Sequence, residues 1–209
     1  MTTTNATTSL TWKCSCGNVQ IPIQGLPLID VTCHCRSCVS VIQFIEQKAD
    51  NGKPPRISGL DKQNGGATYS GIPLHHFELS PHDAPKFGYV KLGKNGPKAR
   101  VYTQCCHTFV FHGGSWPFCF RMFNRHGLIL ANGSPYTPSI IYNIMKNHAA
   151  DPTKVPLDNT SDERPPSLTR LLEASRTPDR DLTPYLNHPI VNPDLDTCQV
   201  VPMTWDEEP

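Results

Sequence analysis

The strongest constraint on how this chain can fold is a short stretch in which three cysteines crowd together. Cys33, Cys35 and Cys38 follow the pattern Cys-x-Cys-x-x-Cys. Thiolates bind Zn²⁺ at about 2.3 Å in tetrahedral geometry, so two sulfurs on one ion lie roughly 3.8 Å apart. Residues two apart in a straight strand are separated by about 6.6 Å. The backbone must therefore fold back here, and the spacing predicts a zinc site.

Three thiolates from one short segment leave one of the four coordination positions of zinc unfilled. Zinc enzymes keep such a position for substrate or water, whereas structural zinc sites fill all four positions with protein ligands. The motif alone leaves both interpretations open. Either a cysteine from elsewhere closes the site and the metal stabilises the fold, or the metal carries chemistry.

Two further cysteine groups stand on either side of this motif. Cys14 and Cys16 form a Cys-x-Cys pair followed by a glycine, and Cys105 and Cys106 are adjacent. Residues 1–9 are rich in threonine and carry no apolar core, so we expect a flexible arm rather than a signal peptide. Nine cysteines, seven of them in these three groups, without a secretory signal favour metal binding over disulfides.

Composition narrows the classes of function. The net charge of +1 gives no electrostatic footprint for nucleic acid. No window approaches the ~20 apolar residues of a spanning helix, so we expect no membrane contact and a soluble, cytoplasmic protein. Cys119 and Cys198 stand alone, and we expect both to be structural or neutral, because isolated cysteines are commonly small buried hydrophobes.

Short apolar runs alternate with turn residues through much of the chain, which predicts a mainly β fold of packed antiparallel sheets with a few short helices. The runs are residues 10–13, 19–23, 67–70, 75–79, 88–92, 100–103, 108–112, 117–123 and 128–131. We expect residues 39–45, apolar and β-branched, to form a further buried strand, and residues 48–66 to form a loop. Residues 124–127 predict a hairpin turn in which Gly127 adopts a positive φ.

A helix is expected after these strands. Thr137 suits its N-cap, Pro138 its first position, and residues 140–145 supply an apolar face. We divide the chain into the arm 1–9, a zinc-binding β domain 10–150 and a proline-rich extension 151–209. The extension has few large apolar residues apart from a short helix expected near residues 168–172, so it either packs on the domain or stays mobile.

The three cysteine groups, in this order and at these separations, resemble the motifs of the glutathione-dependent formaldehyde-activating enzyme family, which includes centromere protein V. Residues 14–17 match its Cys-x-Cys-Gly, and residues 33–38 match its Cys-His-Cys-x-x-Cys. Residues 100–108 are similar to its Arg-x-Phe-Cys-x-x-Cys-Gly-Thr, and residues 76–80 to the strand that precedes this motif in the family. The resemblance covers roughly residues 10–135.

The resemblance implies a zinc-bearing fold of the β-tent type with two zinc ions. It assigns the active zinc to Cys33, Cys35 and Cys38. Three of the four ligands of the structural zinc are then Cys14, Cys16 and Cys106. The fourth structural position is Thr103, whose hydroxyl is a poor zinc ligand. Either Cys105 or His107 replaces it, or this zinc is lost; we favour Cys105. His34 is expected to support the turn rather than to bind metal.

The resemblance implies a carbon–sulfur lyase acting on a glutathione adduct, with zinc as cofactor and a small molecule as substrate. Cys33, Cys35 and Cys38 are the expected catalytic residues, because an open zinc can bind a substrate sulfur and lower its pKa. The alternative is a non-catalytic, zinc-stabilised binding module. A third interpretation, methionine sulfoxide reduction, needs a nucleophilic cysteine in a polar pocket, and Cys119 lies among aromatic residues instead.

Overall fold

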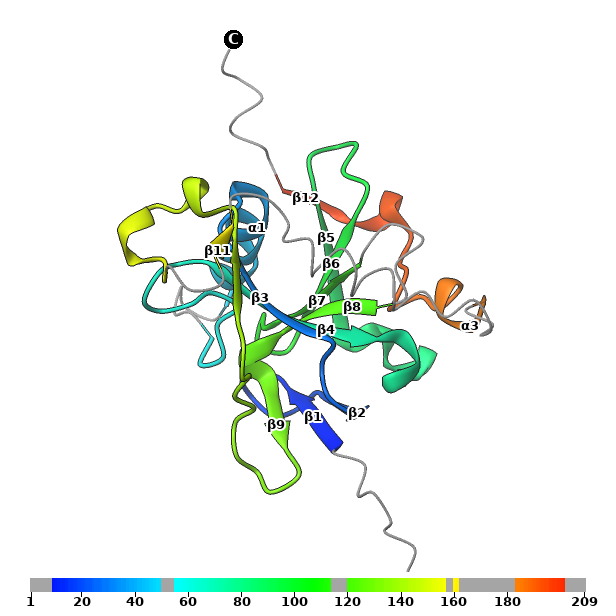
Figure 1. Ribbon diagram of the computed structural model, residues 1–209. Helices are drawn as coiled ribbons and strands as arrows, with labels where there is room; N and C mark the ends of the chain where they lie inside the picture. The colour runs from blue at the N-terminus through cyan, green and yellow to red at the C-terminus, as the bar shows by residue number, and fades with distance from the viewer. Residues whose placement is uncertain (1–8, 50–54, 114–119, 157–159, 162–182, 202–209) are drawn as a thin grey trace, which may run out of the picture.

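The computed structural model describes residues 9–49, 55–113, 120–156, 160–161 and 183–201. This part of the chain is mainly β, as the alternating pattern predicts, and forms two sheets with a few short helices (Figure 1). The small sheet has the order β2 (Gln20–Gln24), β1 (Ser9–Lys13), β9 (Leu128–Leu130). The large sheet has the order β11 (Thr160–Ser161), β10 (Tyr142–Ile144), β3 (Ile29–Cys33), β4 (Ala67–Pro73), β8 (Phe120–Asn124), β7 (Phe109–Gly113), β6 (Ala99–Thr103), β5 (Phe87–Leu92), β12 (Gln199–Val201).

Short helical segments join these strands. The α-helices are α1 (Arg36–Glu46) and α3 (Thr183–Leu186). The 3₁₀ turns are η2 (Leu74–His76), η3 (Pro81–Lys86), η4 (Arg125–Gly127), η5 (Lys146–His148), η6 (Pro152–Lys154) and η7 (Leu195–Thr197). None of the helices in the described residues has the length and apolar character needed to cross a membrane.

The strands in the middle of both sheets pair antiparallel, as expected, but the edges of the large sheet do not. β10 runs parallel to β3 and to β11, and β12 runs parallel to β5. A hairpin forces neighbouring strands to be antiparallel, whereas a strand that arrives from a distant segment is free of this constraint. The large sheet is therefore mixed.

Most of the expected strands are confirmed. Residues 10–13, 19–23, 67–70, 88–92, 100–103, 108–112 and 128–131 overlap β1, β2, β4, β5, β6, β7 and β9, respectively. Residues 117–119 lie outside the described residues, and the remainder of that expected strand is β8. Residues 55–66 of the expected loop form no strand beyond an isolated bridge between Leu60 and Ala67.

The expected strand at residues 39–45 is wrong, because this segment belongs to helix α1. The buried side chains Val41, Ile42 and Ile45 recur at helical spacing, whereas a strand would bury alternate residues. The β-branched content misled the prediction. Tertiary contacts override this weak local preference, since the helix buries its apolar face against the large sheet.

Two further local expectations near turns are also wrong. Residues 75–79 are not a strand: η2 occupies the start, and only Phe77 makes an isolated bridge, to Ile23. Residues 124–127 are not a hairpin turn, because η4 carries the chain from β8 in the large sheet to β9 in the small one. Gly127 is not among the residues with positive φ. A Cβ there would lie 2.3 Å from Nε1 of the buried Trp12, so close packing explains this glycine.

The helix expected from Thr137 is also wrong. Residues 137–141 have no regular structure, and Tyr142–Ile144 form strand β10 beside β3. An amphipathic helix would bury its apolar stripe on one side, but Ile140 is 50% exposed. Asn143 is buried instead and faces its partner Thr32 across the pair of strands.

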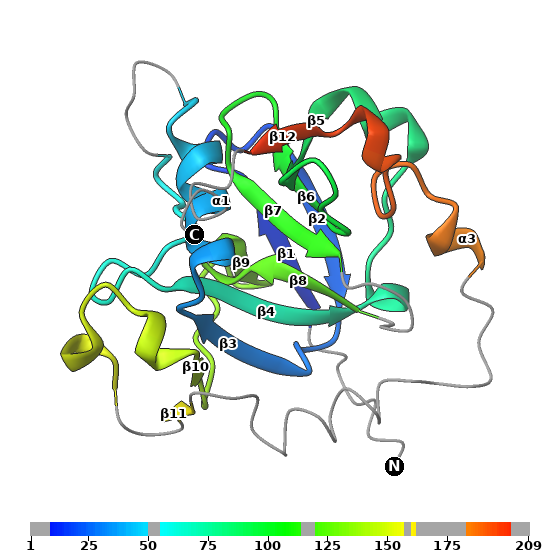
Figure 2. The same cartoon turned by 90° about the horizontal axis from the view of Figure 1, so that it is seen from above.

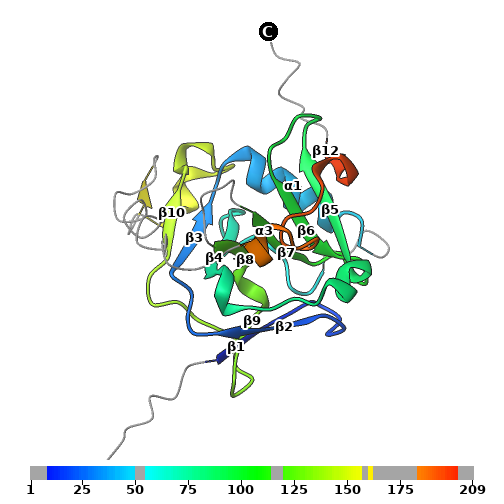
Figure 3. The same ribbon diagram turned by 90° about the vertical axis from the view of Figure 1, so that its right-hand side faces the viewer.

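The large sheet separates two hydrophobic cores. On one face the small sheet contributes Leu10, Trp12 and Leu128 to a core with Phe111 and Phe123. On the other face α1 packs on a core that contains further residues of β3, β4, β5 and β7: Cys33, Tyr69, Val90 and Phe109. In Figure 3, α1 and the small sheet lie toward opposite ends of the view, with the strands of the large sheet between them.

The described parts of the proline-rich extension pack on the β domain. Ile190 and Val191 are buried in the core beneath the small sheet, and the Val191 carbonyl accepts a hydrogen bond from Nε of Arg121 at 3.2 Å. Strand β12 adds to the edge of the large sheet. The short helix expected near residues 168–172 lies outside the described residues.

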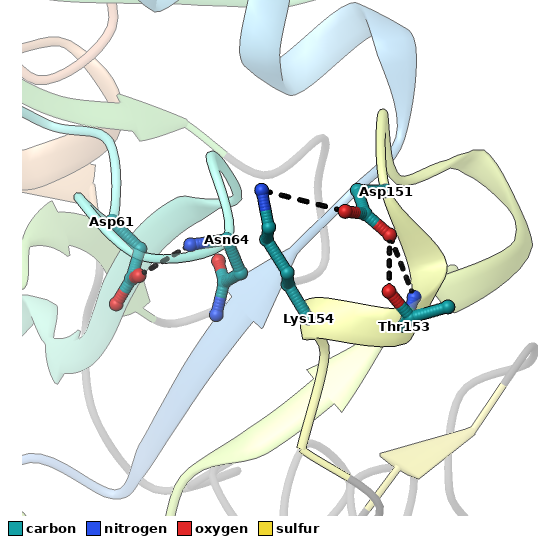
Figure 4. A network of polar contacts seen from close by, with 5 residues as sticks. All are labelled: Asp61, Asn64, Asp151, Thr153 and Lys154. Atoms are coloured by element: carbon teal, nitrogen blue, oxygen red, sulfur yellow. Dashed lines mark hydrogen bonds and ion pairs between the residues drawn. The ribbon is translucent and has the colours of Figure 1, made fainter.

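Aspartate side chains close two turns, shown from close by in Figure 4. Oδ1 of Asp61 accepts a hydrogen bond from the backbone N–H of Asn64 at 3.0 Å. Asp151 caps η6 by accepting from the N–H of Thr153 at 3.1 Å, and its other oxygen lies 3.4 Å from Nζ of Lys154. Such Asx turns satisfy backbone donors without a strand partner, which allows the irregular segments to hold one conformation.

Candidate metal centres

Four cysteines converge where the small sheet meets the large one. We call Cys14, Cys16, Cys105 and Cys106 the outer cluster. Cys14 follows β1, and Cys105 and Cys106 lie in the turn between β6 and β7. The Sγ atom of Cys105 lies 3.8 Å from that of Cys14, 3.3 Å from that of Cys16 and 3.8 Å from that of Cys106.

The outer cluster fits a tetrahedral metal ion bound by sulfur. All four Sγ atoms lie within 4.8 Å of one another, and the distances from Cys105 to the other three sulfurs are close to the roughly 3.8 Å expected for two thiolates on one zinc ion. Four thiolate ligands complete the coordination of zinc. This cluster could therefore hold a metal ion with no position left for a substrate.

Hydroxyl groups hold the two segments of the outer cluster together. Thr108 accepts a hydrogen bond from the backbone N–H of Ser15 at 3.1 Å, and its hydroxyl lies 2.9 Å from that of Ser15. Burial alone would raise the pKa of Cys106, but hydrogen bonds from the Thr103 and Thr108 hydroxyls and from Cys16 outweigh it and lower the pKa to about 6. Cys106 thus loses its proton more readily than an ordinary cysteine, and the thiolate is the form that binds metal.

The structure brings Cys105, rather than Thr103 or His107, into the outer cluster. Thr103 is fully buried at the end of β6, and its hydroxyl lies 3.4 Å from the sulfur of Cys106, so it supports a ligand instead of supplying one. His107 has a positive φ of 51°, and its ring stacks on Tyr102 with 5.5 Å between centroids. This arrangement favours Cys105 as the fourth sulfur.

Three cysteines form a second group at the junction of β3 and α1. We call Cys33, Cys35 and Cys38 the central cluster. Cys33 is the last residue of β3, Cys35 is the N-cap of α1, and Cys38 lies in the first helical turn. The chain turns back at Cys35, whose carbonyl accepts from the N–H groups of Cys38 and Val39 at 3.1 and 3.2 Å. The fold-back expected from the spacing is therefore a strand-to-helix turn.

The central cluster has the donor set of a metal site with an unfilled position. The three Sγ atoms lie within 4.8 Å of one another, and those of Cys33 and Cys35 are 3.3 Å apart. Among the described residues the group contains these three ligands and no fourth. Cys33 is buried, whereas Cys35 and Cys38 are half-buried.

The sulfurs of the central cluster share negative charge. Hydrogen bonds from Cys33 and Cys38, and a further contact with the Ser37 hydroxyl at 3.2 Å, lower the pKa of Cys35. The hydrogen bond between Cys33 and Cys35, followed by that with Cys38 and by burial, raises the pKa of Cys33. Three thiolates at this spacing repel one another, so full ionisation requires a cation among them. The cluster is thus suited to a metal ion.

Two side chains beside the central cluster were missed by the sequence analysis. Burial, followed by the nearby charge of Cys38, raises the pKa of Tyr69 on β4, and the ring of His112 on β7 meets that of Tyr69 edge-on with 4.8 Å between centroids. Burial, followed by the nearby charge of Arg100, lowers the pKa of His112 to about 3. His112 is therefore neutral at physiological pH. No local motif marks these residues, since they come from separate strands.

The remaining candidates are not members of either cluster. His34 is buried after the end of β3, where its backbone N–H donates to the Ile144 carbonyl at 3.0 Å. It therefore supports the turn, as expected. Cys198 is buried at the end of η7. Cys119 lies outside the described residues.

These two centres define a mainly β protein with two cysteine clusters that could each hold a metal ion. No protein-family model matches the sequence, and no curated protein matches it either.

Proposed function

We propose that the protein is a zinc-dependent enzyme that forms or breaks a carbon–sulfur bond in a thiol adduct, as the resemblance to the glutathione-dependent formaldehyde-activating family suggests. The observation that supports this most is the contrast in ligand number: four sulfurs converge in the outer cluster and three in the central one. A site with three protein ligands is the arrangement that catalytic zinc uses.

The proposed reaction adds a thiol to a carbonyl compound. The sulfur bonds to the carbonyl carbon, the π electrons move to the carbonyl oxygen, and the thiol proton ends on that oxygen, so no oxidant or reductant is needed. Zinc would supply a Lewis acid that lowers the pKa of a thiol. Cys33, Cys35 and Cys38 would hold the ion.

Glutathione is the thiol that the resemblance implies, and an aldehyde or related electrophile is the second substrate. Such an enzyme would work in the cytoplasm, where thiols are kept reduced. We infer a small-molecule substrate rather than a nucleic acid, because the net charge is only +1.

The second candidate function is a zinc-stabilised binding module without chemistry. It is favoured by the position of the central cluster, whose members join the end of β3 to the first turn of α1. A metal ion there would also fix the helix to the sheet.

The two functions are separated by assaying thiol consumption. Zinc-loaded protein is mixed with glutathione and a panel of aldehydes, and free thiol is followed with time. We expect catalysis by the wild type and by Cys198→Ser, whose sulfur lies outside both clusters, and none by Cys35→Ser that retains its circular dichroism spectrum. A wild type inactive with every pair would reject the enzyme and favour the binding module.

A further inference from the structure

The four sulfurs of the outer cluster differ in how far solvent reaches them. Cys14 is buried and Cys106 is half-buried, whereas Cys16 and Cys105 are exposed. The Sγ atoms of the exposed pair are 3.3 Å apart, closer than those of Cys14 and Cys16 at 3.5 Å. Oxidation of cysteine follows thiolate character and exposure. An oxidant in solution therefore meets Cys16 and Cys105 before the other two sulfurs.

The exposure of Cys105 follows from its place in the turn between β6 and β7. Thr103, the last residue of β6, is fully buried, and its hydroxyl lies 3.4 Å from the sulfur of Cys106. A sulfur at position 103 would thus reach the same cluster from the inside of the protein. Because the fourth sulfur comes from Cys105 instead, the cluster has a second sulfur that faces solvent.

The two turns that carry the exposed sulfurs are held by hydrogen bonds that need no metal. The N–H of His107 donates to the carbonyl of Thr103 at 2.8 Å and closes one turn. Ser15, which precedes Cys16 in the other turn, donates its N–H to the Thr108 hydroxyl at 3.1 Å. Figure 2 shows the strands that these turns connect, with β1 and β2 behind β6 and β7. The two exposed sulfurs should therefore stay close together when a metal ion leaves.

Other pairs of sulfurs in the outer cluster are poorer partners for a disulfide. A disulfide places its two Cα atoms about 4.4–6.8 Å apart, whereas the Cα atoms of adjacent residues are held about 3.8 Å apart. A bond between Cys105 and Cys106 would therefore be strained, and Cys14 is shielded from solvent. Cys16 and Cys105 stand 89 positions apart in sequence, so no such restriction applies to them.

The central cluster is better protected from the same reaction. Cys33 is buried, and Cys35 and Cys38 are half-buried. The Sγ atoms of Cys33 and Cys35 are also 3.3 Å apart. Proximity of sulfurs is thus common to both clusters, whereas a close pair with both members exposed is found in the outer cluster.

We propose that the outer cluster is an oxidation site, at which hydrogen peroxide joins Cys16 to Cys105 in a disulfide and the metal ion of this cluster is released. One thiolate attacks an oxygen of the peroxide, the O–O bond breaks and hydroxide leaves, which yields a sulfenic acid. The second thiolate attacks the sulfenic sulfur, the S–O bond breaks and another hydroxide leaves. Two thiolates are oxidised and one peroxide is reduced. Only two sulfurs then remain of the four that zinc requires in a structural site.

The disulfide would keep the two sheets joined after the metal has left. Cys16 lies in the turn between two strands of the small sheet, and Cys105 in a turn of the large sheet. A cross-link that closes a long loop stabilises a protein by restricting the unfolded chain. Oxidation should therefore release the metal without unfolding the protein, and a thiol reductant should reverse it by thiol–disulfide exchange.

The test follows metal release and disulfide formation together, so it needs no measurement of activity. Zinc-loaded full-length protein is treated with hydrogen peroxide, released zinc is recorded with a chromogenic chelator, and disulfides are mapped by mass spectrometry after free thiols are alkylated. We expect release of one zinc ion per chain, loss of two free thiols, a disulfide between Cys16 and Cys105, and an unchanged circular dichroism spectrum. Dithiothreitol and added zinc should restore the metal content.

A double variant, Thr103→Cys with Cys105→Ser, tests the role of exposure. It moves the fourth sulfur to the buried position at the end of β6. It should bind two zinc ions and keep both during the time in which peroxide removes one from the wild type. Cys198→Ser is the matched control, because it removes a buried thiol outside both clusters and should release zinc as the wild type does.

Three results would overturn the inference: peroxide releases no zinc from the wild type, the central cluster is oxidised before the outer one, or the disulfide joins a different pair of cysteines. Equal zinc release by the double variant and the wild type would also contradict it. If the double variant does not fold, the disulfide map of the wild type still decides between Cys16–Cys105 and any other pair. None of these results depends on whether the central cluster is catalytic.

Discussion

The outer and central clusters use the same ligand atom but connect the chain in different ways. The sulfurs of Cys14 and Cys105 lie 91 positions apart in sequence, and their cluster joins the small sheet to the large one. The central cluster draws all three sulfurs from six consecutive residues and joins β3 only to the helix that follows. A metal that closes a long loop restricts the unfolded chain more than one that closes a short turn.

This difference separates the two roles. The outer cluster has four sulfurs and long-range connections, which suit structural stabilisation, whereas the central cluster has three sulfurs and a partly accessible setting, which suit chemistry. Substitutions in the outer cluster should therefore mainly lower stability, whereas substitutions in the central cluster should mainly lower activity.

The largest effect is expected from Cys14→Ser. Structural zinc contributes on the order of 10 kcal/mol in small zinc domains, which is comparable with the total stability of a typical domain, about 5–15 kcal/mol. This variant should lose the outer metal and most of its soluble yield, as measured by elemental analysis and chemical denaturation. Cys198→Ser is the control, since it alters a buried cysteine outside both clusters. Equal damage in the two variants would contradict a structural role for the outer cluster.

Cys105→Ala tests which residue completes the outer cluster. We expect it to lower the zinc content by one ion per chain and to lower the melting temperature, because a site with three sulfurs and water binds metal more weakly. Thr103→Val should keep both zinc ions and cost only about 1–2 kcal/mol, the loss of a buried hydrogen bond. Unchanged metal content in Cys105→Ala would reject this ligand, and loss of zinc in His107→Ala would assign the role to His107.

Cys35→Ser should have a smaller effect on stability than Cys14→Ser. It should lower the zinc content by one ion and abolish turnover, while destabilising the protein by only a few kcal/mol, because the core beneath the small sheet contains none of the central cysteines. Denaturation monitored by circular dichroism measures this. If Cys35→Ser unfolds the protein as fully as Cys14→Ser does, the central metal is structural and the binding-module function is preferred.

His112 should make the region of the central cluster sensitive to acid. Its pKa is about 3 when folded, below its ordinary value of 6.5, so the folded state takes up a proton less readily than the unfolded state. Its contribution to stability is complete above pH 6.5 and is lost as the pH falls toward 3. Between pH 7 and 5 this loss amounts to about 2 kcal/mol. Between pH 7 and pH 5, the free energy of unfolding of His112→Gln, measured by urea denaturation, should therefore fall by about 2 kcal/mol less than that of the wild type. Equal falls in the two proteins would show that His112 is not responsible.

The sequence predicts features whose residues lie close together in the chain better than features that join distant segments. The central cluster follows from cysteine spacing, because three ligands stand within six residues. The joining of Cys14 and Cys16 with Cys106 was implied by the family resemblance, and Cys105, which the structure brings to them, was the favoured one of three alternatives. Helix α1 was mistaken for a strand because Val39, Val41, Ile42 and Ile45 suggest β structure, although the spacing of the buried residues is helical.

Long-range features could not be predicted in the same way. Strand β10 pairs with β3, and β12 with β5, only because distant segments meet at the edges of the sheet. Tyr69 lies on β4, whereas Arg100 and His112 lie on the successive strands β6 and β7, so no short motif joins all three residues. Their proximity follows from strand order and register, which a single sequence does not specify.

The most direct test of the account is whether an added thiol reaches one metal ion and not the other. Protein loaded with two Co²⁺ ions in place of zinc is titrated with a small thiol, and the sulfur-to-cobalt charge-transfer absorption is recorded. The account predicts an increase corresponding to one additional thiolate per chain in the wild type and in Thr103→Val, and none in Cys35→Ser. A spectrum that does not change with thiol, although both ions are bound, would show that the central site is closed and would contradict the central claim.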